Sequence, residues 1–258
     1  MIKIAVCIKQ VPKGDTKMDD AGILIRNELV TNPYDYYALE QALILKDKYG
    51  AKIDVFSLAP PKCKENFKEQ FALGVDNCYH IVDDAFRGAD VFATAYTISS
   101  AIKKIDNYDL ILCGRQTTDG DTSAVSCSIA ENLSLPSVMY VLKVDNITDN
   151  TIVVTRQLTN KIEQLEVKMP AVLSVEKDTV IPRIATLKNK LLANKKIATT
   201  ITINDLDDTN PNHYGEFGSK TKVLKIYEQT PLDKGIKVEG TSEEIANFII
   251  SEVKKVIK

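Results

Sequence analysis

Residues 109–136 constrain the fold more than any other stretch, because they join an apolar run to a helical pattern through a small, polar loop. Leu110 to Cys113 is typical of a short buried strand. The loop from Gly114 to Ser123 is rich in Gly, Thr and Asp, and apolar residues at helical spacing follow it until Pro136. This order of elements predicts a βα unit whose helix begins directly beside the end of a strand.

Such a turn is also a site where anions bind. The first N–H groups of a helix have no partner within the helix, and the helix dipole adds positive potential there. We therefore expect a nucleotide whose phosphate lies near Thr122 to Val125. The alternative from spacing alone is that Asp121 or Thr122 only caps the helix, since capped βα turns are common.

The same alternation of strand and helix runs through the first half of the chain. Strands are predicted over residues 2–9, 52–59 and 78–82. Helices are predicted over 35–49 (capped by Asp35, ended by Gly50), 62–73 (ended by Gly74) and 90–105 (capped by Asp90). A small hairpin is predicted over 19–26. This pattern predicts an α/β fold with a mostly parallel, doubly wound sheet of Rossmann-like type. Ligands bind at the carboxyl ends of such strands, so residues 7–10, 58–60 and 114–121 should share one rim.

The pattern changes after Pro136. Residues 151–158 and 161–168 predict an added β-hairpin around Thr159-Asn160, and 171–175 predict a further strand. Residues 185–196 form a basic amphipathic segment, 204–240 an extended arm, and 241–257 a helix with a capping box. We expect an α/β nucleotide-binding domain over 1–180, a loop over 181–200 and a C-terminal arm over 201–258 that docks on a partner. The alternative is that the final helix folds back on its own domain.

Composition excludes several classes of protein. The formal net charge of −2 argues against nucleic-acid binding, and no apolar run is long enough to cross a membrane. The five cysteines contain no CxxC pair and His80 and His213 lie far apart, which favours a reducing cytoplasm and argues against a disulfide framework or a metal site.

Seven motifs together resemble one family. They are Val6–Pro12, Asn32–Asp35 with the Ala-Leu-Glu-Gln-Ala helix, Ser57–Pro60, Ala72–Asp76, Gly114–Thr122, Met169–Val175 and Pro182–Leu187. In this order and spacing they make the chain similar, nearly end to end, to the small (beta) subunit of electron-transfer flavoprotein. The chain departs from that family's pattern at Ala124–Cys127, where many relatives have Gln-Val-Gly-Pro, and in the hairpin around Thr159. The first departure leaves open which nucleotide binds.

The resemblance implies a heterodimer with the alpha subunit, whose FAD moves electrons to a flavin-dependent, acyl-CoA-type dehydrogenase. In bifurcating relatives from anaerobes the beta subunit holds a second FAD, which NADH reduces, and one electron goes to ferredoxin or flavodoxin. The loop Asp119–Thr122 resembles these members most, so FAD is favoured over structural AMP. A stress-type nucleotide-binding domain is a second alternative, although the chain lacks the Gly-rich phosphate loop of that class.

The resemblance also implies which residues serve the nucleotide and the partner. No catalytic acid–base pair and no metal ligand is expected, since the chemistry belongs to the flavin. Arg115 is expected beside the flavin or paired with Asp119 or Asp121. Leu187 is expected to anchor the dehydrogenase, and the alternative is an internal amphipathic helix that buries Leu187 and Leu191 in this subunit. The expected nucleotide contacts are Cys7, Asn32, Pro33, Tyr34, Asp35, Leu58, Gly114, Arg115, Gln116, Thr117, Thr118, Asp119, Gly120, Asp121, Thr122, Ser123, Ala124 and Val125.

Overall fold

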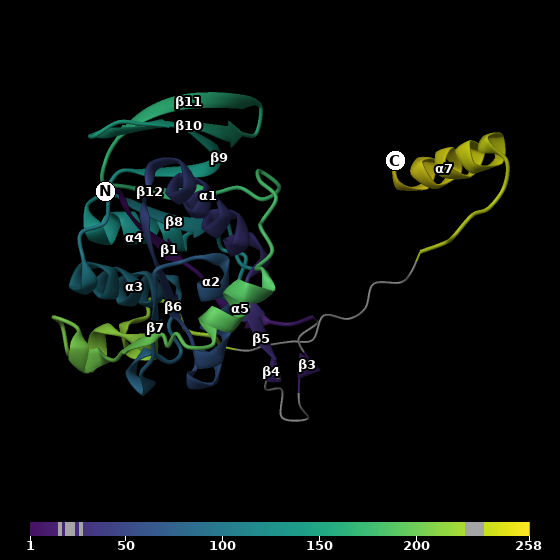
Figure 1. The fold of residues 1–258 in the computed structure, drawn as a ribbon. Coiled ribbons are helices and arrows are strands. Elements are labelled where there is room, and N and C mark those ends of the chain that lie inside the picture. The colour runs from purple at the N-terminus through teal and green to yellow at the C-terminus, as the bar shows by residue number, and fades with distance from the viewer. Residues whose placement is uncertain (15–16, 19–23, 26–27, 225–234, 258) are drawn as a thin grey trace. The chain divides into compact units, whose positions relative to one another are not determined.

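A nine-stranded sheet forms the centre of the larger of two units (Figure 1). The computed structural model describes residues 1–14, 17–18, 24–25, 28–224 and 235–257, and the strand count refers to these. The units comprise residues 1–224 and 225–258, and each is described by itself. The strand order is β11 (Lys161–Lys168), β10 (Thr151–Leu158), β9 (Ser137–Ile147), β12 (Ala171–Val175), β8 (Leu110–Gly114), β1 (Lys3–Cys7), β6 (Lys52–Leu58), β7 (Asn77–Ile81) and β13 (Thr199–Ile201).

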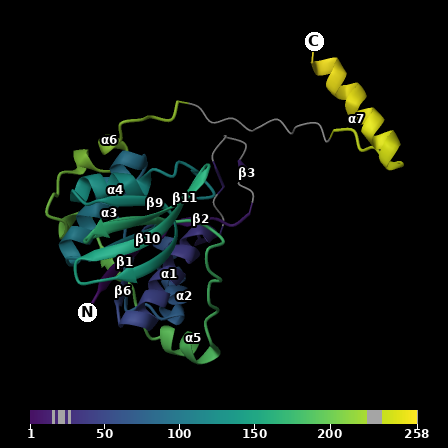
Figure 2. The same cartoon turned by 90° about the horizontal axis from the view of Figure 1, so that it is seen from above.

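The predicted parallel, doubly wound architecture is confirmed. All pairings from β9 through β12, β8, β1, β6 and β7 to β13 are parallel. Helices α1 (Pro33–Tyr49) and α2 (Phe67–Leu73) cover one face, and α3 (Val91–Ile105) and α4 (Val125–Leu133) cover the other (Figure 2). Strand β1 therefore buries Ile4 and Val6 on one side and Ala5 and Cys7 on the other, which explains its unbroken apolar run.

Two helix predictions need correction. Helix α1 begins at Pro33 with Asn32 at its N-cap, so Asp35 lies in the first turn and is not the cap. Proline suits this first position because it has no N–H to satisfy. The single helix predicted over 62–73 is divided into the 3₁₀ helix η1 (Pro61–Asn66) and α2. The ends at Gly50 and Gly74, both left-handed, agree with prediction.

Short antiparallel pairs lie outside the main sheet. Strand β2 (Gln10–Pro12) pairs with β5 (Leu29–Thr31), and β3 (Lys17–Met18) pairs with β4 (Leu24–Ile25). The hairpin predicted over 19–26 lies mostly outside the described residues.

The hairpin β10–β11 is confirmed around Thr159-Asn160, but its neighbour β9 was not predicted. Strand β9 pairs with β12 in parallel near its start and with β10 in antiparallel further on. Its first half carries an apolar run, Val138–Leu142, but only Val138 and Val141 are buried and the second half has no clean alternation. It is tertiary pairing on both sides that makes this segment a strand.

Residues 199–224 also differ from the expected arm, because they pack within the larger unit. They form β13, η3 (Ile203–Asp205), η4 (Pro211–His213) and α6 (Gly215–Gly218). Tyr214 is fully buried, with its ring 5.2 Å from that of Phe86, in η2 (Asp84–Phe86), and 5.4 Å from that of Tyr96. An aromatic contact of this kind fixes a segment that has little local periodicity.

The second unit contains α7 (Ser242–Val256), with the predicted capping box between Thr241 and Glu244. Ile249, Ile250 and Val253 on this helix are exposed. Within the described residues, no helix has the length and apolar character needed to span a bilayer.

Candidate nucleotide-binding cleft

A cleft of about 460 Å³ opens at the carboxyl ends of β1, β6 and β8. The strand ends expected to share a rim do so here. The cleft is lined by Cys7, Ile8, Lys9, Asp35, Leu58, Gly88, Ala89, Asp90, Val91, Thr94, Ile98, Cys113, Arg115, Thr117, Asp119, Gly120, Thr122, Ser123, Ala124 and Val125.

The buried side chain of Asp35 joins the ends of β1 and β8 by hydrogen bonds. Its carboxylate accepts a hydrogen bond of 2.7 Å from the backbone N–H of Lys9 and another from that of Gly114. The side chain is 4 % exposed, and this burial outweighs the hydrogen bonds and raises its pKa to about 7. A Cβ at Gly114 would lie 2.3 Å from the Asp35 carboxylate, so only glycine fits at this strand end.

Asn32 holds the next part of the loop. Its amide donates to the carbonyl of Gln116 (2.9 Å) and accepts from the N–H of Thr118 (3.3 Å). Gln116 in turn donates to the hydroxyl of Tyr34 at 3.3 Å. These four residues do not line the cleft, but their hydrogen bonds hold the backbone of the loop that follows Gly114.

The following turn has an unusual backbone. Asp121 and Ser123 have positive φ angles of 49° and 53°, which non-glycine residues rarely adopt. Lys9 and Asp119 both line the cleft and form an ion pair of 2.7 Å. Burial raises the pKa of Asp119, but its contacts with Lys9 outweigh that and lower it. Backbone strain such as that at Asp121 and Ser123 is typical of loops that are shaped for a ligand.

The N-terminus of α4 faces the cleft without a side-chain cap. Its N-cap residue is Ala124, so the alternative in which Asp121 or Thr122 caps the helix is wrong. Thr122 to Val125 all line the cleft beside these first-turn N–H groups. The arrangement can hold a phosphate, as the sequence predicts.

Two thiols form part of the floor. Cys7 and Cys113 are register partners on β1 and β8, and both are buried yet line the cleft. The hydrogen bond between their side chains, with burial, raises the pKa of the Cys113 thiol well above its usual range. A raised pKa makes the Cys113 thiol a poor nucleophile, and both side chains form part of the cleft wall.

Arg115 is not paired with either aspartate expected for it. Its guanidinium donates to Glu176 at 2.9 Å and lies 5.3 Å from the ring centre of Tyr140. The residue lines both the cleft and a neighbouring hollow of about 510 Å³ that Tyr140 and Glu176 also line. Its Nε atom is buried and has no hydrogen-bond partner among the described residues.

The expected contacts thus divide into two groups. Cys7, Asp35, Leu58, Arg115, Thr117, Asp119, Gly120 and Thr122 to Val125 line the cleft, whereas Asn32, Pro33, Tyr34, Gly114, Gln116, Thr118 and Asp121 lie outside its lining. Ile8 and Lys9 lie on the rim predicted over residues 7–10, whereas Cys113 and the wall formed by Gly88–Val91, Thr94 and Ile98 were not predicted. The Asp90 cap that begins α3 was a usable signal, since a helix following a parallel strand also starts at this rim.

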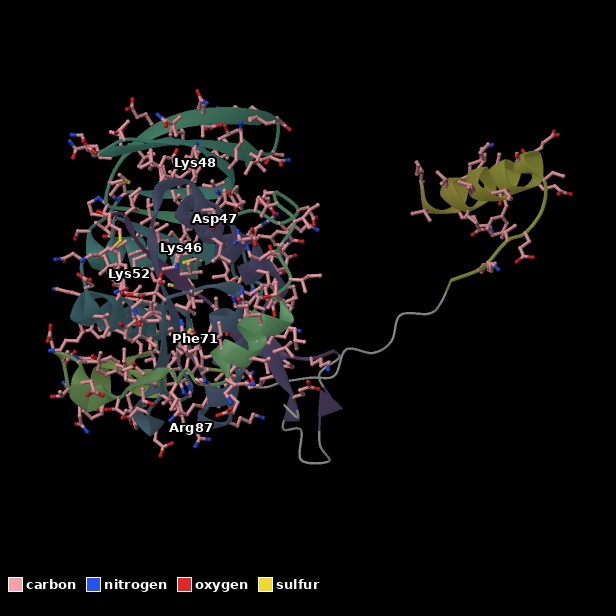
Figure 3. The ribbon with its side chains drawn as sticks, in the orientation of Figure 1. Lys46, Asp47, Lys48, Lys52, Phe71 and Arg87 are labelled. Carbon is pink, nitrogen blue, oxygen red and sulfur yellow. The ribbon has the colours of Figure 1, made fainter. Side chains whose placement is uncertain are left out.

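A second surface lies on α5 (Leu187–Ala193). Leu187 is 74 % exposed and Leu191 60 %, so the alternative in which both pack inside the larger unit is wrong for the described chain. The segment is fastened at both ends. Before the helix, Arg183 donates to the buried Glu40 at 2.9 Å; after it, Lys196 lies 5.0 Å from the ring centre of Phe71, which is beside α5 in Figure 3.

Comparisons with known proteins now bear on the site. Residues 22–207 match the model of the electron transfer flavoprotein domain. The chain belongs to the electron transfer flavoprotein beta-subunit family. It is 37 % identical to the electron transfer flavoprotein subunit beta of Clostridium acetobutylicum over 258 residues, 98 % of each chain. Identity to the same subunit of Thermoanaerobacterium thermosaccharolyticum is 40 % over 228 residues, 86 % of each chain. Identity to the caffeyl-CoA reductase-Etf complex subunit CarD of Acetobacterium woodii is 35 % over 98 % of each chain.

Membership of the electron transfer flavoprotein family removes the stress-type domain from consideration. It also fits the chemistry of the cleft. Within the described residues, His, Cys, Asp and Glu form no group of three or more that could hold a metal ion.

Proposed function

We propose that this chain is the beta subunit of a cytoplasmic, electron-bifurcating flavoprotein and holds FAD in the cleft. Its large-subunit partner carries a second FAD. Electrons enter from NADH and leave by two routes, one to ferredoxin or flavodoxin and one to a flavin-dependent, acyl-CoA-type dehydrogenase.

The observation that carries the nucleotide assignment is the uncapped N-terminus of α4 at the edge of the cleft. Its first-turn N–H groups and the hydroxyls of Thr122 and Ser123 would hold the phosphates. Cys7 and Leu58 would wall the adenine. Asp35 and Asn32 keep these parts in place, because each joins loops that are distant in sequence.

A bound flavin supplies the redox chemistry, and the chain supplies its position and electrostatics. Arg115 is the residue suited to the second task, because its side chain lines the cleft. A fixed cation there stabilises negative charge on a neighbouring group. The pair with Glu176 orients the guanidinium and lowers the net positive charge that it presents.

Two features favour bifurcation over simple electron transfer. The loop Asp119–Thr122 resembles the bifurcating members, and two relatives are named as subunits of acyl-CoA-type reductase complexes. One is CarD, and another is the acryloyl-CoA reductase electron transfer subunit gamma of Anaerotignum propionicum, 34 % identical over 98 % of this chain.

The competing function is a subunit with structural AMP in the same cleft. The decisive measurement is the flavin content of the complex purified with its large subunit. About two flavins per heterodimer, one of them reduced by NADH, support bifurcation. About one flavin with equimolar AMP would replace that proposal with simple electron transfer.

Docking completes the proposal. The exposed leucines of α5 serve the dehydrogenase, since exposed apolar anchors on an ordered support are typical of interfaces. The exposed apolar residues of α7 serve the large subunit, because a helix with an exposed apolar stripe needs a partner to cover it.

A further inference from the structure

Asp90 belongs to the wall of the cleft and also holds a distant part of the chain. One carboxylate oxygen accepts from the N–H of Ala93 at 3.0 Å and caps α3. The other accepts from the N–H of Lys220 at 2.8 Å and that of Thr221 at 2.9 Å. Burial raises the pKa of Asp90, but these hydrogen bonds outweigh it and lower it, so the charged form is favoured.

The contacts around Asp90 extend this connection. The Asp90 N–H donates to the Ser219 hydroxyl at 2.9 Å, and the N–H of Glu216 donates to the Arg87 carbonyl at 2.8 Å. A Cβ on Gly215 would lie 2.3 Å from the Ala85 carbonyl oxygen. The loop that contains Arg87, labelled in Figure 3, therefore packs closely against residues 215–221 and is hydrogen-bonded to them.

Residues 219–224 come directly before the second unit, which begins at Lys225. We name Ser219–Leu224 the arm root. The arm root thus shares the Asp90 carboxylate with α3, whose first residues line the cleft together with Gly88 and Ala89.

We infer that Asp90 is a positioning residue that couples nucleotide binding in the cleft to the placement of the arm root. This inference rests on the proposed function of the cleft. A nucleotide that contacts the Gly88–Thr94 wall restrains the α3 N-terminus, and that restraint stabilises the hydrogen bonds to Lys220 and Thr221. Coupling between binding sites is reciprocal, so a fixed arm root strengthens nucleotide binding by the same factor.

The two amides that Asp90 holds report the coupling directly. We expect saturating AMP or FAD to slow hydrogen exchange at Lys220 and Thr221 of the full-length chain by about fivefold, a usual size for such coupling. Asp90→Asn keeps one side-chain oxygen to cap α3, but its amide nitrogen replaces the oxygen that accepts from the N–H groups of Lys220 and Thr221. It should abolish this slowing and weaken AMP binding, measured by calorimetry, by the same factor.

Two further variants isolate the effect. Thr221→Pro removes a donor from the arm root and leaves the α3 cap intact, so its AMP affinity should also fall. Asp83→Asn is the matched control, because Asp83 likewise joins Ala85 (3.0 Å) to Ile203 (3.2 Å) but does not line the cleft. It should keep the nucleotide-dependent slowing at Lys220 and Thr221.

Tight AMP or FAD binding with unchanged exchange at Lys220 and Thr221 would overturn the coupling and leave the proposed function standing. Undiminished slowing in Asp90→Asn would do the same. Failure of the full-length chain to bind either nucleotide would overturn the proposed function, and the coupling with it.

Discussion

The cleft and the α5 segment place their side chains in opposite ways. In the cleft, buried polar groups such as Asp35 and Asn32 bind the backbone of neighbouring loops and shape a recess. On α5, Leu187, Leu191 and Leu192 are exposed, while the ends of the segment are fixed by Arg183 and Lys196.

The difference shows how one sheet supports two kinds of recognition. A recess preorganised by hydrogen bonds suits a small, charged ligand, because little order is lost when that ligand binds. Exposed leucines on a fixed segment suit a protein, whose surface can bury them. The comparison predicts that charge changes affect the cleft most and that loss of apolar area affects α5 most.

The largest effect is expected at the phosphate end of the cleft. Thr122→Glu with Ser123→Glu should release the nucleotide, since one like-charge pair at about 4 Å costs about 4 kcal/mol near a protein surface. The measurement is nucleotide content after purification. Thr122→Gln with Ser123→Gln has the same size without charge and should retain far more nucleotide. Equal retention in the two double variants would show that no phosphate lies there.

Asp35 should make stability depend on pH. Because its pKa is raised to about 7 in the folded chain, the folded state binds the proton more tightly than the unfolded chain does. Its contribution is complete below about pH 4 and is lost as the pH rises to about 7, with a total of about 4 kcal/mol at 1.36 kcal/mol per pH unit.

The measurement is urea unfolding of the wild-type chain and Asp35→Asn between these pH values. The asparagine stays neutral, so its free energy of unfolding should decline less as the pH rises. If the free energy of unfolding depended on pH equally in the two proteins, Asp35 would be ionised in the folded chain over this whole pH range.

Leu187→Ala tests the α5 surface. Burying a leucine contributes roughly 1.5–3 kcal/mol, so the variant should weaken transfer to the dehydrogenase by roughly tenfold or more. NADH-dependent flavin reduction and assembly with the large subunit should be unaffected. Exposed Ile162 on β11 offers a matched control, and Ile162→Ala should leave transfer unchanged. Loss of assembly or of flavin in Leu187→Ala would place that leucine in a core.

The smallest effect is expected at Arg115. Arg115→Ala should slow flavin reduction by NADH severalfold in stopped-flow experiments and change the melting temperature little. Glu176→Gln breaks the same ion pair but keeps the cation, so it separates the effect of the Arg115 charge from the effect of losing the ion pair. An unaltered reduction trace in Arg115→Ala, or equal slowing in both variants, would count against a direct effect of the cation.

The sequence by itself determined the βαβ order, the hairpin β10–β11, the two glycine helix ends and the loop at the head of α4. These features depend on local patterns: apolar periodicity, turn residues, and glycine at left-handed positions. Motif order was enough to predict the family, which the comparisons confirm.

Only the tertiary structure decided the rest. Strand β9 and the packing of residues 199–224 depend on partners that are distant in sequence. The same is true of Asp35, which holds Lys9 and Gly114, and of Arg115, which binds Glu176 and not a nearby aspartate. A hydrogen bond between distant residues leaves no periodic trace in the sequence, so the folded backbone alone decides which polar groups meet.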